Sequence, residues 1–225
     1  MSRPNFHNII ATLEEEYGPP RPPKVTDPFG MILWENVAYL VDDERRDVAF
    51  AALKKRIGLT AEKILAARDK DLLEVAALGG MLPPMRVEKL RRIAQITTTR
   101  FKGDLRPVLK LPLKQAMRAL KIYPGIADAG AEKILLFSGT LPVLALESNG
   151  LRVLVRLGYG EESKNYSAMY RSAQRAAEPE IPPDCAWLTK AHQLLRQHGR
   201  ELCKTNRPLC HQCPLTRCCR FYQGR

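Results

Sequence analysis

The feature that most constrains this chain is a group of cysteines near its C-terminus. Five of the six cysteines lie in the last 23 residues, and four of them follow the spacing C-x6-C-x2-C-x5-C. These four are Cys203, Cys210, Cys213 and Cys219. The spacing winds four thiolates around one centre within 17 residues, as a cubane iron–sulfur cluster requires. In a cytosolic chain, such clustering favours a metal site over disulfides.

Zinc is the alternative use of the same four thiolates. Structural zinc usually takes its cysteines from two C-x2-4-C pairs, and this segment holds one such pair, Cys210 and Cys213. We therefore predict a 4Fe–4S cluster and keep zinc as an open alternative. Cys218 adjoins Cys219 and could exchange roles with it, whereas Cys185 is predicted to be a small buried apolar residue.

Composition indicates a folded protein with a polyanionic partner. The 225 residues suffice for one domain or two small ones, and 27% charged with 45% apolar residues is a globular balance. The net charge of +12 favours nucleic acid over a membrane, because no strongly basic amphipathic helix stands out. The N-terminus lacks the apolar stretch of a signal peptide, so we expect a soluble, cytoplasmic protein.

Helical periodicity recurs along the chain, and no convincing alternating strand pattern interrupts it. The first helix ends at Gly18, before the stiff segment 19–23, which contains four prolines. Asp27 then caps a helix that we expect to run to about Val41. Further helices are expected at about 44–56, 60–67, 70–78, 85–99, 113–121, 128–138, 148–157, 163–177 and 186–199. The predicted class is all-α.

A glycine turn joins two of these helices in the segment Leu120-Lys121-Ile122-Tyr123-Pro124-Gly125-Ile126-Ala127. Such a turn exposes backbone N–H groups at a helix N-terminus, and these can hold a DNA phosphate without reading sequence. Taken alone, Pro-Gly between helices is most often an ordinary turn. Together with the cysteine spacing and the preceding His198-Gly199-Arg200, it makes the chain resemble the endonuclease III superfamily of helix-hairpin-helix DNA glycosylases, over about residues 27–221.

The resemblance implies a two-lobed fold with a 4Fe–4S cluster. A six-helix barrel with the hairpin would span 27–141, and a cluster domain would combine 1–26 with 142–225. Double-stranded DNA would lie in the groove between the lobes, bound by a monomer associated with the nucleoid. Candidate phosphate contacts near the cysteines are Arg200, Lys204, Arg207 and Arg217.

The hairpin departs from the family pattern L-P-G-V-G in two places. Ala127 replaces the second glycine, and Asp128 puts a negative charge where a phosphate would sit. The resemblance still implies contact with DNA along the hairpin and the helix that follows. The residues concerned are Tyr123, Gly125, Ile126, Ala127, Ala129 and Gly130.

The lysine of the family's bifunctional members is missing. Its amine attacks the sugar and forms a Schiff base, and the matching position here is Ala129. Lys133 lies one helical turn further on and is predicted to be a solvated surface lysine. We therefore expect no strand cleavage through a Schiff base.

Two glutamates are the candidate catalytic carboxylates. Glu147 matches the family aspartate that stabilises the cationic sugar as the base leaves, although its side chain is one methylene longer. Simple helix capping is the alternative role for Glu147. Glu35 matches a glutamate of the monofunctional branch, where the adenine enzyme uses it to protonate the departing base. The alternative for Glu35 is an exposed position on its helix.

The gap left by a flipped base would be filled by apolar side chains. The run Tyr39-Leu40-Val41 stands where the family usually has polar residues, and Tyr39 could enter the duplex together with Met81 or Leu82. Buried core is the alternative for each of the three. The resulting hypothesis is a monofunctional DNA N-glycosylase, and the alternatives are a non-catalytic DNA-binding or damage-sensing protein and a protein for another polyanion such as RNA.

Overall fold

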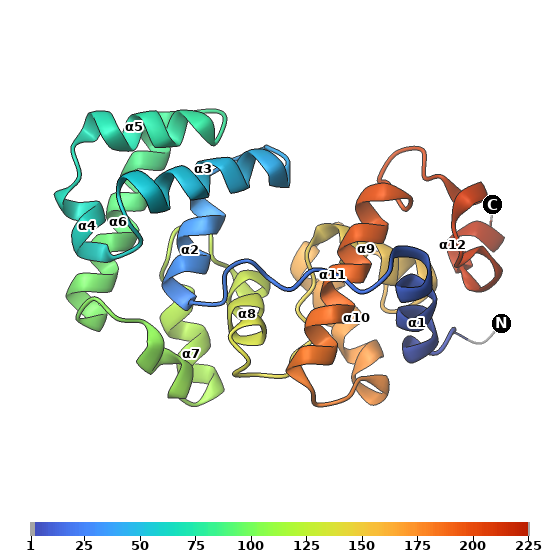
Figure 1. The fold of residues 1–225 in the computed structure, drawn as a ribbon. Coiled ribbons are helices and arrows are strands. Elements are labelled where there is room, and N and C mark those ends of the chain that lie inside the picture. The colour runs from blue at the N-terminus through green and yellow to red at the C-terminus, as the bar shows by residue number, and fades with distance from the viewer. Residues whose placement is uncertain (1–2, 225) are drawn as a thin grey trace. The chain divides into compact units, whose positions relative to one another are not determined.

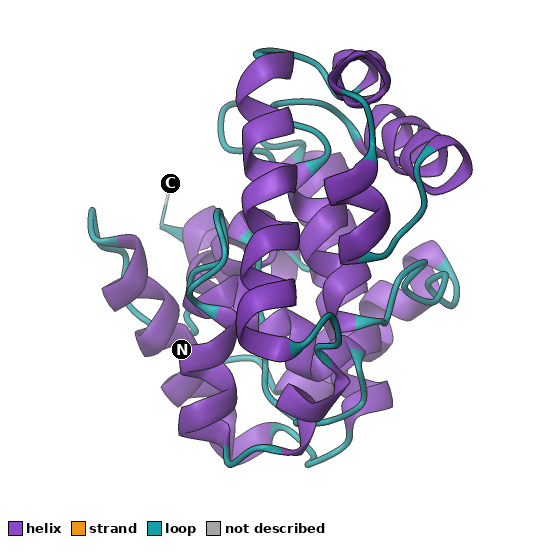
Figure 2. Cartoon of the chain, turned by 90° about the vertical axis from the view of Figure 1, so that its left-hand side faces the viewer, coloured by secondary structure: helices purple, strands orange, loops and turns teal. Residues whose placement is uncertain are grey.

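A computed structural model describes residues 3–224 and shows an all-α protein. Helices joined by loops make up the described chain, and its only extended pairing is a single parallel bridge between Tyr39 and Gly80 (Figure 2). The predicted all-α class is confirmed. No helix in this part of the chain is both long and apolar enough to cross a membrane.

The chain divides into two compact units (Figure 1). One unit is the continuous segment 24–140. The other combines the N-terminal segment up to residue 23 with the segment from residue 141 onward. In this second unit the helix nearest the N-terminus packs against a helix about 180 residues later in the chain, so its core combines segments from both ends of the sequence.

The unit 24–140 is built around its longest helix, α6 (Pro83–Phe101). This helix packs against α2, α4 and α5, and it buries Leu90, Ile93 and Ala94. The helices that surround it or follow it are α2 (Pro28–Asn36), α3 (Asp43–Arg56), α4 (Ala61–Ala66), α5 (Asp69–Leu78), the 3-10 helix η1 (Arg106–Lys110), α7 (Leu113–Leu120) and α8 (Asp128–Phe137).

The second unit is organised around the pair formed by α9 (Ser148–Leu157) and α11 (Cys185–Glu201). Helix α1 (Phe6–Tyr17) packs on α11 and buries Phe6, Ile9, Ile10 and Leu13. The remaining elements are α10 (Tyr166–Ala177), α12 (Arg220–Gln223) and the short 3-10 helices η2 (Glu178–Glu180), η3 (Cys210–Gln212) and η4 (Thr216–Cys218).

One predicted helix end is wrong. Helix α2 ends at Asn36 instead of continuing to about Val41. The Asn36 side chain turns back to donate to the carbonyls of Ile32 and Pro124, at 2.9 and 3.0 Å, and Leu40 adopts a left-handed φ of +53° that no helix accommodates. Because the helix stops there, Tyr39 and Leu40 lie on a loop.

Helices α9 and α11 approach most closely at Gly199. A Cβ atom at this position would lie 2.6 Å from the carbonyl oxygen of Asn149, a contact that backbone atoms cannot relieve without moving. Glycine at 199 is therefore required by packing against the first turn of α9. Gly130 offers a matched comparison, since a Cβ there would meet only ordinary contacts, at 3.5 Å or more, with the Ile126 side chain.

We expect Gly199→Ala to lower the free energy of unfolding by about 1–3 kcal/mol, because an added methyl group forces the two helices apart. Gly130→Ala should leave stability unchanged or raise it by up to about 1 kcal/mol, because alanine is the better helix former. Urea denaturation followed by circular dichroism measures both. Equal effects of the two substitutions would contradict the packing role of Gly199.

Candidate functional site

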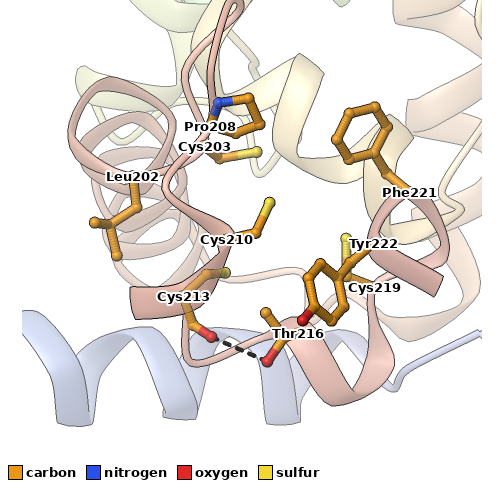
Figure 3. A pocket seen from close by; sticks show the side chains of 9 residues that line it. All are labelled: Leu202, Cys203, Pro208, Cys210, Cys213, Thr216, Cys219, Phe221 and Tyr222. Atoms are coloured by element: carbon orange, nitrogen blue, oxygen red, sulfur yellow. Dashed lines mark hydrogen bonds between the residues drawn. The ribbon is translucent and has the colours of Figure 1, made fainter. Parts of the chain in front are cut away.

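The four predicted metal-binding cysteines line one small cavity at the C-terminal end of the second unit (Figure 3). Cys203 follows the end of α11, and the other three follow in the short turns between α11 and α12. The rest of the wall comes from Leu202, Pro208, Thr216, Phe221 and Tyr222. Among the described residues, no group of three or more His, Cys, Asp or Glu side chains is placed to hold a single metal ion.

The electrostatics of this cavity disfavour unpaired thiolates. Burial, together with the charges of the neighbouring Cys203, Cys219 and Cys210, raises the pKa of Cys213 to about 11. Burial likewise raises the pKa of Cys219. Four thiols around one cavity fit the donor set of a 4Fe–4S cluster, in which each iron takes one cysteine thiolate.

Two nitrogen donors from outside the cysteine segment reach the sulfurs. Arg156 Nη1 donates to Cys203 Sγ at 3.3 Å, and His198 Nε2 lies 3.4 Å from Cys213 Sγ. Burial lowers the pKa of His198 to about 4, so the ring is neutral near pH 7. The hydroxyl of Tyr17 lies 2.9 Å from Nδ1 of His198. When Nε2 carries the ring proton and donates to the sulfur, Nδ1 accepts a hydrogen bond from this hydroxyl. Such donors stabilise thiolate charge.

Cys218 and Cys185 lie outside this set. The Cys218 thiol donates to the carbonyl of Leu215, at 3.3 Å, and does not line the cavity. Cys185 is the first residue of α11 and is partly exposed, so the prediction that it is buried is wrong.

The loop between the first two cysteines exposes basic side chains on a fixed backbone. Lys204 and Arg207 are exposed, and Arg207 has a left-handed φ of +54°. Arg156 donates to the carbonyls of Lys204 and Thr205, at 2.8 and 3.1 Å, and its guanidinium lies 4.3 Å from the ring centroid of Phe221. Arg200 is also exposed, at the end of α11. The structure leaves these cations accessible to an anionic partner.

Glu147 is the N-cap of α9. Its carboxylate accepts from the backbone N–H of Gly150, at 2.7 Å, and from Asn149 Nδ2, at 2.8 Å. The capping role proposed as an alternative for Glu147 is therefore present. Glu147 is half-buried.

A chain of hydrogen bonds leads from Glu147 to the first cysteine. Asn149 donates to Glu147 and accepts from Arg152 Nη2 at 2.8 Å. Arg152 Nε donates to the carbonyl of Cys203 at 2.8 Å, and Nη2 also donates to that of Gly199 at 2.7 Å. The sequence analysis did not identify Arg152 or Arg156. Their i, i+4 spacing places them on one face of α9, but it does not reveal the carbonyls they bind.

The hairpin lies between α7 and α8 in the unit 24–140. Some of its residues are buried and others are exposed. Tyr123 and Ile126 are buried, and the Tyr123 hydroxyl lies 2.9 Å from Thr97 Oγ1. Gly125 and Ala127 are exposed, and Gly125 has a left-handed φ of +73°.

The side chains of Tyr123 and Ile126 are buried, so the DNA contacts predicted at these two positions would have to use backbone atoms. These two residues anchor the turn in the core. What the hairpin can offer is backbone at Gly125 and Ala127 and the first N–H groups of α8, beside the half-buried Ala129 and Gly130. The charge of Asp128 is offset by Lys121, whose Nζ lies 2.5 Å from its carboxylate.

Lys133 and Glu35 form an ion pair between α8 and α2. Arg46 Nη1 lies 3.6 Å from the second oxygen of Glu35, and its guanidinium stacks 4.6 Å from the Trp34 ring centroid. Only 17% of the Lys133 side chain is exposed, so the predicted solvated surface lysine is wrong. Two cations therefore lie beside the Glu35 carboxylate, and its role as a proton donor stays a prediction.

Tyr39, Met81 and Leu82 come together on two adjacent loops of the unit 24–140. The backbone N–H of Tyr39 donates to the carbonyl of Gly79 at 3.0 Å. The exposed fractions are 51% for Tyr39, 61% for Met81 and 51% for Leu82, so none of them belongs to the core. Leu82 has a left-handed φ of +54°, a strained conformation of the kind that collects at functional sites.

Comparison with known proteins finds endonuclease III and DNA glycosylase relatives, although no family model matches the chain. Endonuclease III of Thermotoga maritima is 25% identical over 92% of this chain and 89% of its own length. Endonuclease III of Sulfolobus acidocaldarius is 23% identical over 88% and 84%, respectively. Thymine/uracil-DNA glycosylase of Pyrobaculum aerophilum is 27% identical over 63% and 58%.

Solved structures match over nearly the whole chain. A trapped endonuclease III–DNA covalent intermediate has a TM-score of 0.76, covers 99% of both chains and is 16% identical in sequence. A thermostable thymine-DNA glycosylase has a TM-score of 0.77, covers 98% of this chain and 97% of its own, and is also 16% identical.

The fold is therefore that of the helix-hairpin-helix DNA glycosylases. The sequence relatives include endonuclease III proteins, which supports the resemblance that the cysteine spacing and the hairpin predicted.

Proposed function

We propose that the protein is a DNA N-glycosylase of base excision repair that removes a damaged or mismatched base without cleaving the strand. The proposal rests on the residues at the two positions that could supply an amine nucleophile. Ala129 occupies the lysine position of the bifunctional relatives, and Lys133, one turn further on, is paired with Glu35. An ammonium held by a carboxylate is a poor nucleophile, because its electron pair is bound to a proton.

Features of both units support binding to double-stranded DNA, and we propose that the protein binds it as a monomer. The hairpin backbone at Gly125 and the N-terminus of α8 offer N–H groups to a phosphate, and the exposed Lys204 and Arg207 add positive charge. Tyr39, Met81 and Leu82 are bulky apolar side chains of the kind that enter a base stack and fill the gap left by a flipped nucleotide.

The proposed chemistry is hydrolysis of the glycosidic bond. The bond between the sugar carbon C1′ and the base nitrogen breaks, and the base leaves with the electron pair and takes up a proton. Water then adds to C1′ and releases a proton. Glu147 stabilises the positive charge that develops on the sugar. Glu35 is the second candidate catalytic carboxylate, and it lies beside Lys133 and Arg46.

The four cysteines are proposed to hold a 4Fe–4S cluster, which would tie the end of α11 to the C-terminal turns. The cluster ligands would be Cys203, Cys210, Cys213 and Cys219, with donors from Arg156 and His198 beside two of the sulfurs.

A protein purified without oxygen should be yellow-brown, with broad absorption near roughly 400 nm from thiolate-to-iron charge transfer. Metal and sulfide analysis should find iron and acid-labile sulfide, and Cys203→Ser should remove the colour. Cys218→Ser is the matched control and should keep it, since its thiol faces the carbonyl of Leu215. A colourless protein with stoichiometric zinc would support the alternative metal.

Borohydride should trap no covalent protein–DNA complex on any substrate, because Ala129 has no amine and Lys133 is held by Glu35. A panel of damaged and mismatched duplexes is incubated with the protein, with and without borohydride, and separated on denaturing gels. A known bifunctional relative serves as the positive control. Trapping that disappears in Lys133→Met would show that the amine had moved by one helical turn.

Glu147→Gln should lower single-turnover excision by at least about 100-fold while leaving DNA affinity nearly unchanged, because it removes charge stabilisation that acts mainly in the transition state. The amide oxygen of glutamine can still cap α9, so a change in helix stability should contribute little to a loss of activity. Treatment of the same duplex panel with hot alkali reveals the abasic sites. Full activity of Glu147→Gln would assign the chemistry to another group.

A catalytically inactive DNA-binding or damage-sensing protein is the second candidate. It is favoured by the capping bonds that occupy Glu147 and by its extra methylene, which can displace a carboxylate by about 1 Å and cost on the order of 100-fold in rate. A panel in which every duplex is bound and none yields an abasic site would select this candidate.

A further inference from the structure

The loop that carries Met81 and Leu82 is packed backbone to backbone against the loop that carries Tyr39. A Cβ atom at Gly79 would fall 2.1 Å from the carbonyl oxygen of Val37, so only glycine fits there. Gly80 has a left-handed φ of +99°. Segment 79–82, which we call the wedge loop, thus has one side fixed by its neighbour.

The other side of the wedge loop is held by a buried arginine. Arg86, in the first turns of α6, is 3% exposed. Its Nη2 donates to two carbonyls, that of Ala76 in the last turn of α5, at 2.7 Å, and that of Gly80, at 2.5 Å. A single nitrogen therefore joins the end of α5 to the residue that immediately precedes Met81.

To make these two hydrogen bonds, the charged guanidinium of Arg86 has to be buried, which is energetically unfavourable. Its Nε and Nη1 have no hydrogen-bond partner, and no carboxylate pairs with it among the residues that the structure describes. Burial and the nearby Arg45 lower the pKa of its guanidinium. The partial negative charge at the C-terminal end of α5 offsets only part of this cost. Packing alone does not explain a buried cation without a carboxylate partner, which indicates a functional role for Arg86.

We propose that Arg86 is a positioning residue that holds the wedge loop in the conformation in which Met81 and Leu82 enter the duplex. The inference rests on the proposed DNA binding. Without the clamp, the strained backbone at Leu82 would relax, because a left-handed leucine persists only where its surroundings enforce it. A loop ordered before binding also avoids the entropy cost of being ordered on the DNA.

Arg91 provides a matched control on the same helix. Its guanidinium also binds carbonyls at a helix end, those of Leu65 at 3.0 Å and Ala67 at 2.8 Å, but these belong to the end of α4. Arg91 also pairs with Asp69, at 2.5 Å. Arg91→Met therefore removes an arginine cap and an ion pair without touching the wedge loop. Arg86→Met removes the clamp, and Arg86→Lys keeps the charge but cannot reproduce the guanidinium geometry.

The test uses the full-length protein and a duplex that carries 2-aminopurine beside an abasic-site analogue. Entry of the wedge unstacks the fluorescent base, so fluorescence rises when protein saturates the DNA. For Arg86→Met we expect less than about half of this rise in fluorescence. The preference for the abasic duplex, measured as its affinity divided by that for intact duplex, should fall about tenfold, equivalent to roughly 1.4 kcal/mol. The slope of log affinity against log salt should stay unchanged, because no phosphate contact is lost. Arg91→Met should retain the full rise and ratio.

The outcomes separate this inference from the proposed function. A wild-type protein that binds neither duplex, or binds without any rise, would overturn the proposed DNA wedge and this inference with it. A normal wild-type rise that persists in a folded Arg86→Met protein would overturn the inference alone. If Arg86→Met does not fold, Arg86→Lys decides, since a full rise there would show that the two-carbonyl clamp is not needed. An equal loss in Arg91→Met would show that general destabilisation is the cause.

Discussion

The half-buried guanidinium of Arg152 joins α9 to the end of α11 and the first cysteine, 47 and 51 residues later in the chain. It donates to the side chain of Asn149, to the carbonyl of Gly199 and to the carbonyl of Cys203. Burial lowers its pKa, so the charge carries a cost that these bonds offset. Because Asn149 also donates to Glu147, the candidate catalytic carboxylate and the first cysteine share one rigid support.

The close approach of α9 and α11 makes this support possible. Gly199 lets the two backbones meet beside Asn149, and Arg152 can then reach the last carbonyls of α11. One turn further along α9, Arg156 donates to Cys203 Sγ and to the loop behind it. The cavity that we assign to a cluster, the basic loop and the cap of α9 are thus parts of one hydrogen-bonded structure.

The unit 24–140 positions its functional surfaces by the same means, with arginine side chains bound to the carbonyls at helix ends. Arg46 contacts the carbonyls of Trp34 and Glu35 at the end of α2, and Arg86 binds at the end of α5. Cations are favourable at helix C-termini, where unpaired carbonyls carry partial negative charge. Both helices end in the loops that expose Tyr39 and Met81, so each arginine cap lies beside the loop that carries one of these apolar side chains.

The sequence by itself determined the all-α class, most helix positions, the four-cysteine set, the hairpin and the absence of a lysine at position 129, because each depends on local spacing or on residue identity. Only the tertiary structure decided that Lys133 pairs with Glu35, that Tyr123 and Ile126 are buried, and that α2 stops at Asn36. These outcomes depend on partners up to 98 residues away, such as the two members of the Glu35–Lys133 pair. Helical periodicity places a side chain on a face of its helix, but the packing of other helices decides what that face meets.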